Sequence, residues 1–336
     1  MDEVVEKALK QVQSKTRSSV PWKFDEPWHQ PSYTFKDNAW TANDPGSSTG
    51  AASPSLCKLS LYSWNIDFML PFSDSRMHKG LRHLQSLIDS NPEQDSTASI
   101  IYLQECVDSD VHFIASHDWV RRRFNLSDID ISDWQSGHYG TITLVDKRLP
   151  ISSCFRVHYS QTRMERDGLF VDVRMEDKTV RVCNSHLESM AFEPPYRIPQ
   201  MKLCAWYMRQ AGVDGAIAAG DFNAIQEFDR TLHEVNGLKD AYLELGGRED
   251  DPDNGHTWGQ QAATKLRQQF GTSRMDKVYF CGGLELLSFE RFGAGVCVDD
   301  ERQREAVVKL GFDEPWITDH LGVKAVFNVP SSKATL

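Results

Sequence analysis

The chain lacks any apolar run close to the roughly 20 residues that are needed to cross a bilayer. Its opening segment, MDEVVEKALKQVQ, also lacks the apolar stretch of a signal peptide. We therefore expect no membrane attachment and a place inside the cell, in the nucleus or the cytoplasm.

Paired cysteines of the Cys-x-x-Cys type are absent as well. The seven cysteines are an odd number and stand apart along the chain, at positions 57, 106, 154, 183, 204, 281 and 297. This pattern argues against a disulfide framework or a zinc site and favours a reducing compartment. A secreted nuclease or toxin is correspondingly disfavoured.

Positive charge is in short supply, because 37 Lys and Arg residues face 48 Asp and Glu residues, a formal net charge of −11. Proteins that bind nucleic acid non-specifically usually carry a basic surface, since phosphate contacts release counterions. An acidic chain can still receive phosphate through a metal ion and a local basic groove. We interpret the one obvious basic run, Arg121 to Arg123, as a solvated helix end.

Composition changes near residue 55. Residues 1–55 are predicted to be an extension: an amphipathic helix over 2–13, an aromatic and proline-rich segment over 20–40, and a flexible linker over 41–55. We expect the middle segment to drape over the rest of the protein without a regular element. From residue 56 to 330, short β-rich segments alternate with helical ones such as 79–90 and 196–211, which predicts an α/β domain.

Polar side chains follow four of the predicted strands where each strand ends. The motifs are SWNID at 63–67, LQE at 103–105, GDFN at 220–223 and TDH at 318–320. Strand ends hold side chains rigidly, so several of them at one edge of a sheet make a typical site. Each motif alone also fits a turn or surface residue, but together they indicate an active site.

The first three motifs supply carboxylates and amides. Glu105 is a hard oxygen ligand of the kind that Mg²⁺ or Mn²⁺ prefers. Asp221 can accept a proton or bind metal, and Asn223 can orient a nucleophile. We expect Asn65 to bind metal-bound water or phosphate.

The last motif pairs an acid with an imidazole. We expect Asp319 to orient the ring of His320, which would donate to a phosphoryl oxygen. A surface pair is the alternative interpretation. With the carboxylates and amides upstream, the pair predicts metal-assisted hydrolysis of a phosphate ester.

Taken in order, these motifs resemble the endonuclease/exonuclease/phosphatase superfamily. The likeness covers residues 56–329 and adds HYGTITLV, SHLES, SRMDKVYF and HTW to the four motifs. It is closest to the tyrosyl-DNA phosphodiesterase 2 group. The resemblance implies a fold like deoxyribonuclease I, a four-layer α/β sandwich of two mixed β-sheets flanked by helices, and makes 56–330 the catalytic domain.

The resemblance also implies the role of each residue. The implied metal ligands, for Mg²⁺ with Mn²⁺ as the alternative, are Glu105, Asn65 and Asp319. The implied catalytic residues are Asp221, Asn223, His320, His186, Asp319 and Asp276. Asp276 would steady a histidine or contact metal-bound water, although a turn aspartate is nearly as good an interpretation.

The implied substrate is the 5′-phosphotyrosyl link of single-stranded DNA, and the implied process is DNA repair. We expect the enzyme to be a monomer. Its implied contacts are Ser189, Trp258 and Asn65; for Tyr139 we favour a core or rim position instead. Three positions depart from the group's pattern: Phe68 replaces a glycine, Ile225 an arginine, and 190–192 carry no arginine.

Other substrates would use the same centre. The alternatives are a nuclease, a deadenylase or a 2′,5′-phosphodiesterase acting on RNA, and a phosphatase. An alternative of another class is a non-catalytic binding module, against which the complete set of polar residues argues.

Overall fold

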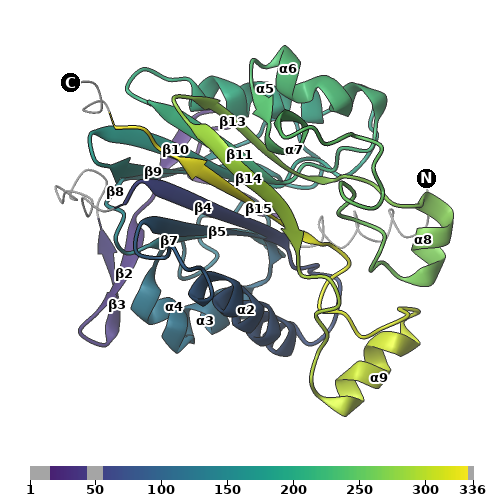
Figure 1. Ribbon diagram of the computed structural model, residues 1–336. Helices are drawn as coiled ribbons and strands as arrows, with labels where there is room; N and C mark the ends of the chain where they lie inside the picture. The colour runs from purple at the N-terminus through teal and green to yellow at the C-terminus, as the bar shows by residue number, and fades with distance from the viewer. Residues whose placement is uncertain (1–15, 44–55, 332–336) are drawn as a thin grey trace.

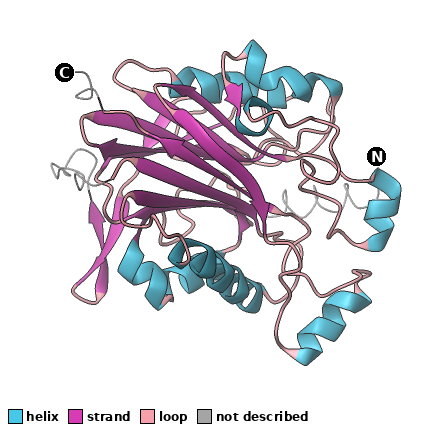
Figure 2. Cartoon of the chain, viewed as in Figure 1, coloured by secondary structure: helices cyan, strands magenta, loops and turns pink. Residues whose placement is uncertain are grey.

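The computed structural model describes residues 16–43 and 56–331. Two β-sheets pack face to face and helices cover their outer faces, so the molecule has four layers (Figures 1 and 2). The predicted four-layer α/β sandwich is confirmed. The helix predicted over 2–13 and most of the predicted linker, residues 44–55, lie outside the described residues.

The first sheet has seven strands in the order β1-β8-β9-β10-β11-β13-β12. Its strands β10 and β11 are parallel and its other neighbouring strands are antiparallel, so the sheet is mixed. The bounds are β1 Pro27–His29, β8 Ile151–His158, β9 Asp167–Met175, β10 Lys178–Ser185, β11 Gly215–Asp221, β12 Lys239–Asp240 and β13 Asp276–Gly282.

The second sheet has eight strands in the order β14-β15-β4-β5-β7-β6-β2-β3. It is also mixed, because β4 and β5 are parallel and its other neighbours are antiparallel. The bounds are β2 Ser32–Lys36, β3 Ala39–Asn43, β4 Lys58–Asn65, β5 Thr97–Cys106, β6 Phe124–Leu126, β7 Gly140–Asp146, β14 Glu285–Phe292 and β15 Gly322–Asn328.

The central strands are apolar along most of their length because both of their faces are buried. In β4, Leu59 and Leu61 point into the core between the sheets, whereas Tyr62 and Trp64 belong to the core beneath the helices. Side chains of a strand alternate between its two faces, so one strand supplies both cores. This double burial fixes the strand ends, where the polar motifs lie.

Helices α2, α3 and α4 cover the second sheet, and α5 and α6 cover the first (Figure 1). The bounds are α2 Ser73–Asp89, α3 Asp108–Ser116, α4 Asp118–Arg123, α5 Arg197–Met208, η1 Glu227–Thr231, α6 Leu232–Val235, α7 Ala241–Glu244, α8 Thr264–Phe270 and α9 Glu301–Lys309. The helices predicted over 79–90 and 196–211 are confirmed as α2 and α5, each with one buried apolar face. However, α2 begins earlier than predicted, and Ile198, which was expected on the apolar face of α5, is 39% exposed. Within the described ranges, no helix combines the length and apolarity of a membrane span.

The prediction that residues 20–40 form no regular element is wrong. This segment supplies β1, which extends the first sheet along β8, and the hairpin β2–β3, which extends the second sheet along β6. Pro27 begins β1, and proline is tolerated at the first residue of an edge strand. Tyr33 and Trp40 pack against the core beneath α2–α4, which explains the aromatic composition.

A buried ion cluster anchors these added strands. Arg156 of β8, with no exposed surface, donates to both carboxylate oxygens of Asp128 at 2.9 Å and to Asp167 at 3.1 Å. Gln30, between β1 and β2, donates to Asp128 at 3.2 Å. The ring of Trp22 stacks on His158 of β8 at 3.9 Å.

Candidate active site

The predicted site residues gather where strands of both sheets end. Asn65 ends β4, Asp221 ends β11 and Asp276 begins β13. Antiparallel pairing of β11 with β13 sets Asp221 opposite Asp276. Among the described residues, two sets of three side chains each bring their donor atoms within 4.8 Å of one another. The first set is Glu105, His186 and Asp221, and the second is Asp221, Asp276 and His320. Asp221 belongs to both sets and is the centre of the site.

Asp221 is 2% exposed and hydrogen-bonded through both oxygens. Its Oδ2 accepts from the Asn65 amide at 3.0 Å and its Oδ1 from the backbone N–H of Asn223 at 2.9 Å. The Nε2 atoms of His186 and His320 lie 3.3 and 3.6 Å from Oδ2. Burial opposes ionisation, but the two imidazoles outweigh it and hold the pKa of Asp221 below its usual range. The carboxylate is therefore ionised at neutral pH.

His320 takes its hydrogen-bond partner from β13. Its Nδ1 lies 2.8 Å from Oδ2 of Asp276, whereas Oδ1 of Asp319 lies 3.8 Å from Nε2. The expectation that Asp319 orients this ring is therefore wrong: the pairing of β13 with β11 brings Asp276 to the imidazole, and Asp319 accepts from Trp258 Nε1 at 2.7 Å instead. Burial would lower the pKa of His320, but Asp276, Asp221 and Asp319 raise it well above its ordinary value. This ring carries a positive charge at neutral pH.

His186 is held in the opposite protonation state. A guanidinium N–H of Arg166 bonds to its Nδ1. Arginine only donates hydrogen bonds, so Nδ1 must accept and the proton must sit on Nε2, which faces Asp221. Burial and the Arg166 charge both lower the pKa of His186. In this tautomer His186 is a neutral hydrogen-bond donor through Nε2.

Three carboxylates crowd beside this centre. Glu105 has a φ of +58° next to an irregularity in the pairing of β5 with β7, and its Oε2 accepts from the backbone N–H of Phe68 at 2.9 Å. Burial, then Asp319 and Glu105, raise the pKa of Asp67 to about 8. Burial likewise raises the pKa of Asp319, and Glu105 adds to it.

This crowding shows that the residues fit a divalent cation. Carboxylates that repel one another in a buried place are stabilised by a cation, and oxygen donors suit Mg²⁺ or Mn²⁺. Asn65 adds an amide oxygen, although its Oδ1 already accepts from the backbone N–H of Asp67 at 2.9 Å. The donor set alone does not distinguish the two metals.

The remaining predicted residues border the same centre. Asn223, with a φ of +46°, donates from its amide to the carbonyl of Leu187 at 3.1 Å. Ser189 accepts from Arg166 at 2.8 Å. Trp258 pairs through its backbone with His320 in an isolated bridge. The structure thus brings every predicted site residue together, while their chemical roles stay predictions.

Tyr139 is buried, as favoured from the sequence, and its hydroxyl donates to the carbonyl of Met164 at 2.6 Å. Its ring nevertheless lies next to the site, with the Arg166 guanidinium 4.9 Å from its centre. Phe68, which departs from the group's pattern, packs 4.5 Å from the same ring. Phe68 thus contacts the site on two sides, through its ring at Tyr139 and through its backbone N–H at Glu105. Another departure, Ile225, is 41% exposed.

Sequence reasoning missed Arg166 and Asp67. Asp67 was within reach, because it lies two residues after Asn65 in the same motif. Arg166 needed strand pairing: β9 and β10 are antiparallel with Gly168 opposite Ser185, which brings the residues before β9 next to those after β10. A hairpin prediction for the two segments would have placed Arg166 beside His186.

Comparison with known proteins identifies relatives in sequence. The chain is 27% identical over 237 residues to 5′-tyrosyl-DNA phosphodiesterase of Caenorhabditis elegans, covering 69% of this chain and 60% of that protein. It is 23% identical over 249 residues to tyrosyl-DNA phosphodiesterase 2 of Homo sapiens, covering 70% and 64%. The chain thus spans less than two thirds of the length of these relatives.

Solved structures share the fold. Truncated Caenorhabditis elegans TDP2 superposes with a TM-score of 0.58 at 23% identity, over 81% of this chain and 97% of that one. TDP2 of D. rerio, complexed with a single-strand DNA product, does so with a TM-score of 0.58 at 17% identity, over 81% and 99%. The model of the Endonuclease/Exonuclease/phosphatase family matches residues 62–320, which include the whole site from Asn65 to His320. The chain belongs to the endonuclease/exonuclease/phosphatase family.

Proposed function

We propose that this chain is an Mg²⁺-dependent phosphodiesterase that hydrolyses the 5′-phosphotyrosyl link of single-stranded DNA during DNA repair. The observation that carries the proposal is an ionised Asp221 between two imidazoles in opposite protonation states, beside crowded carboxylates. Such a centre offers a proton acceptor, two hydrogen-bond donors and a cation site within one buried cluster.

The metal would be held by Glu105, Asn65 and Asp319, with Mn²⁺ as the alternative ion. When bound, it supplies positive charge that offsets the charge growing on a phosphoryl oxygen and on the leaving oxygen. Asp67, whose Oδ1 accepts from the backbone N–H of Met69 at 2.9 Å, lies beside this place; its pKa of about 8 keeps it mostly protonated at neutral pH, and a bound cation would favour its ionised form.

The protein's own groups would divide the remaining work. Asp221 accepts a proton from the attacking water, and the Asn223 amide aligns that water. His320, charged and fixed by Asp276, donates to one phosphoryl oxygen. His186, neutral and fixed by Arg166, donates to another.

The substrate side rests on the relatives and on the aromatic residues. Relatives named tyrosyl-DNA phosphodiesterase, and the D. rerio TDP2 structure with its single-strand DNA product, support a DNA end joined to tyrosine. Trp258 would stack on an unpaired base, and Ser189 would bind a phosphoryl oxygen. A phenolate leaves more readily than a sugar alkoxide, so the reaction needs no further general acid.

We also propose that the protein acts as a monomer inside the cell, in the nucleus or the cytoplasm. The seven cysteines are all free, as predicted, which suits a reducing compartment.

The experiment is hydrolysis of a single-stranded oligonucleotide that carries a 5′-phosphotyrosine, with Mg²⁺ and then with EDTA. A plain DNA strand and a short RNA serve as matched substrates. We expect rapid metal-dependent release of tyrosine with the strands left intact. Cutting of the plain strands would move the protein to a nuclease or deadenylase, and no turnover of any strand would favour a binding module.

A further inference from the structure

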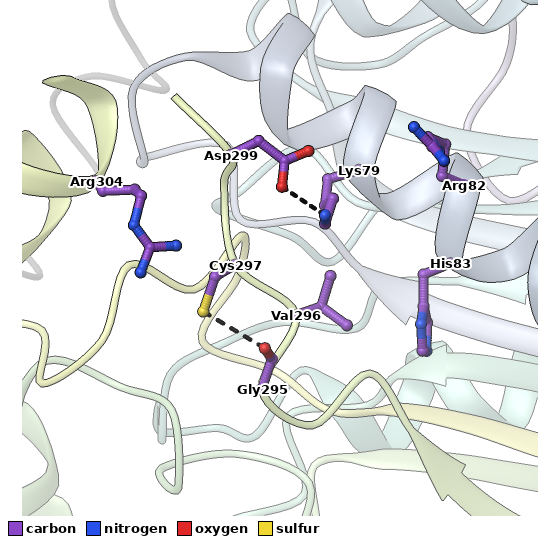
Figure 3. Close-up of a pocket in the computed structure, with 8 residues that line it drawn as sticks. All are labelled: Lys79, Arg82, His83, Gly295, Val296, Cys297, Asp299 and Arg304. Atoms are coloured by element: carbon purple, nitrogen blue, oxygen red, sulfur yellow. Dashed lines mark hydrogen bonds and ion pairs between the residues drawn. The ribbon is translucent and has the colours of Figure 1, made fainter. Parts of the chain in front are cut away.

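A hollow of about 490 Å³ lies outside the active site (Figure 3). One wall is α2, which presents Lys79 and Arg82, and the opposite wall is α9, which presents Arg304. The segment 295–299 runs between them. Three cations from two separate helices therefore surround one open space.

Two of these cations form no salt bridge within the described residues. Lys79 forms an ion pair with Asp299 at 2.6 Å. Arg304 donates only to the backbone carbonyl of Val298, at 3.1 Å, and Arg82 makes no hydrogen bond or ion pair to any residue in 16–43 or 56–331. The hollow is lined by three cations and one carboxylate, Asp299, which Lys79 pairs with and Arg82 also attracts. In a chain of net charge −11, this excess of positive charge is a local reversal of charge.

The base of the hollow is firmly built. Val296 is buried, and the ring of His83 packs against Trp64 and Phe292, with centroid distances of 5.8 and 6.1 Å. Burial lowers the pKa of His83, so this ring adds no positive charge at neutral pH. Apolar side chains behind the cations strengthen their attraction for an anion.

The hollow adjoins the active site through one short loop. The backbone N–H of Ile317 donates to the carbonyl of Val296 at 3.0 Å, and Cys297 forms a β-bridge with Trp316. Ile317 is followed by the TDH motif, whose Asp319 and His320 belong to the site. The segment that lines the hollow is thus bonded directly to the residues that lead into the active site.

We propose that the hollow binds a backbone phosphate of the nucleic-acid strand, at a distance from the scissile phosphate. This inference rests on the proposed function. Guanidinium groups are suited to it, because each presents N–H donors in a fork that matches phosphate oxygens. The hollow is a positioning site for the strand and takes no part in the chemical step.

The test is binding of unmodified single-stranded DNA to the full chain in EDTA, followed by fluorescence anisotropy at several salt concentrations. The variants are Arg82→Gln, Arg304→Gln and the double variant. The matched control is Arg302→Gln, which is exposed on α9 beside Arg304 but does not line the hollow. Loss of the one phosphate contact at the hollow should reduce the slope of log K against log[salt] by about 0.7 in the double variant, and by less in each single variant.

Strand length gives a second readout. Twelve-nucleotide strands should show the loss, whereas strands too short to pass the loop should bind wild type and double variant alike. Arg82→Gln removes no hydrogen bond within the described protein, so its effect is free of the local change that Arg304→Gln could cause. An unchanged salt slope in Arg82→Gln and the double variant, or an equal loss in Arg302→Gln, overturns the proposal.

Two further arms separate the sources of failure. Saturable binding of inorganic phosphate at the hollow, with strand binding unaffected by the double variant, identifies a site for free phosphate and overturns the proposal. If the strand binds through the hollow but phosphotyrosyl DNA is not cleaved with Mg²⁺, the proposed reaction fails and the binding site stands.

Discussion

At the scale of single residues, hydrogen-bond partners give two identical side chains different chemistry. A carboxylate on Nδ1 makes His320 a cation, and a guanidinium on Nδ1 makes His186 a neutral donor. Both rings then present an N–H toward Asp221. The residue bonded to Nδ1 therefore determines the charge that each ring brings to the site.

Asp221→Asn is expected to lower kcat by about 10²- to 10⁴-fold, because the variant loses the group that accepts the proton. The fold should persist, since asparagine keeps the size of the side chain and an oxygen that can accept from Asn65 or from the Asn223 backbone; the lost charge should lower the melting temperature only modestly. Asp214→Asn, at the opposite end of β11 and exposed, is the matched control and should keep full activity. Wild-type turnover in Asp221→Asn would remove Asp221 from the mechanism.

Gly220→Ala should destabilise the fold by about 3 kcal/mol. Gly220 has a φ of +148°, and an added Cβ would lie 1.8 Å from the carbonyl oxygen of Ser185. Gly80→Ala in α2 is the control: its Cβ would make an ordinary contact at 3.5 Å, and the helix should gain up to about 1 kcal/mol. Chemical denaturation measures both, and equal stability of the two variants would contradict the account.

Much of this site could be predicted from the sequence, since three of the four motifs end an apolar strand and strand ends meet at sheet edges. The expectation that TDH also ends a strand is wrong, because this motif precedes β15. The partner of His320 was predicted only in part: Asp276 was expected to steady one of the histidines, which is confirmed, but Asp319 was expected to orient His320, and strand pairing decides between the two carboxylates. Arg166 escaped for a similar reason, as its contact with His186 depends on the register of β9 and β10.

At the scale of elements, periodicity located the central strands and the two long helices, because both faces of β4 and one face of α2 are apolar. The strands from residues 27–43 were not predicted. Their prolines and aromatic residues resemble irregular structure, and they become strands only by pairing with β8 and β6. Local sequence does not carry that tertiary information.

Asp128→Ala is expected to cost about 3–5 kcal/mol, because it leaves Arg156 buried with fewer partners. The loss should fall on the elements that meet at this cluster, β1, β8 and β9. Asp130→Asn, two residues away and exposed, should leave stability unchanged. Urea denaturation followed by tryptophan fluorescence compares the two, and similar midpoints would mean that the cluster contributes little.

At the scale of the whole molecule, Mg²⁺ should stabilise the protein against heat. A ligand at a hundredfold excess over its Kd adds about 2.7 kcal/mol, which raises Tm by several degrees. Glu105→Gln should abolish most of that increase, and NaCl at equal ionic strength should not reproduce it. Scanning calorimetry with and without EDTA measures the shift; an equal increase in Glu105→Gln would place the ion elsewhere.

The four-layer architecture itself was predicted through the resemblance and not from periodicity, which gave only an α/β domain. Two sheets, each with one parallel pair among antiparallel neighbours, do not follow from the order of segments. The prediction of the fold therefore depended on the motifs at the site, whose residues are those that the chemistry requires.

The run from residue 27 to 43 joins the edge of one sheet and then the edge of the other. A single covalent segment thus links the two sheets at their edges. We expect the two sheets to share one opening event, so that amide protons on both exchange with solvent together and not sheet by sheet. Residues 27–43 would then make the unfolding of the two sheets cooperative. These residues are far in sequence from most of the residues of the active site.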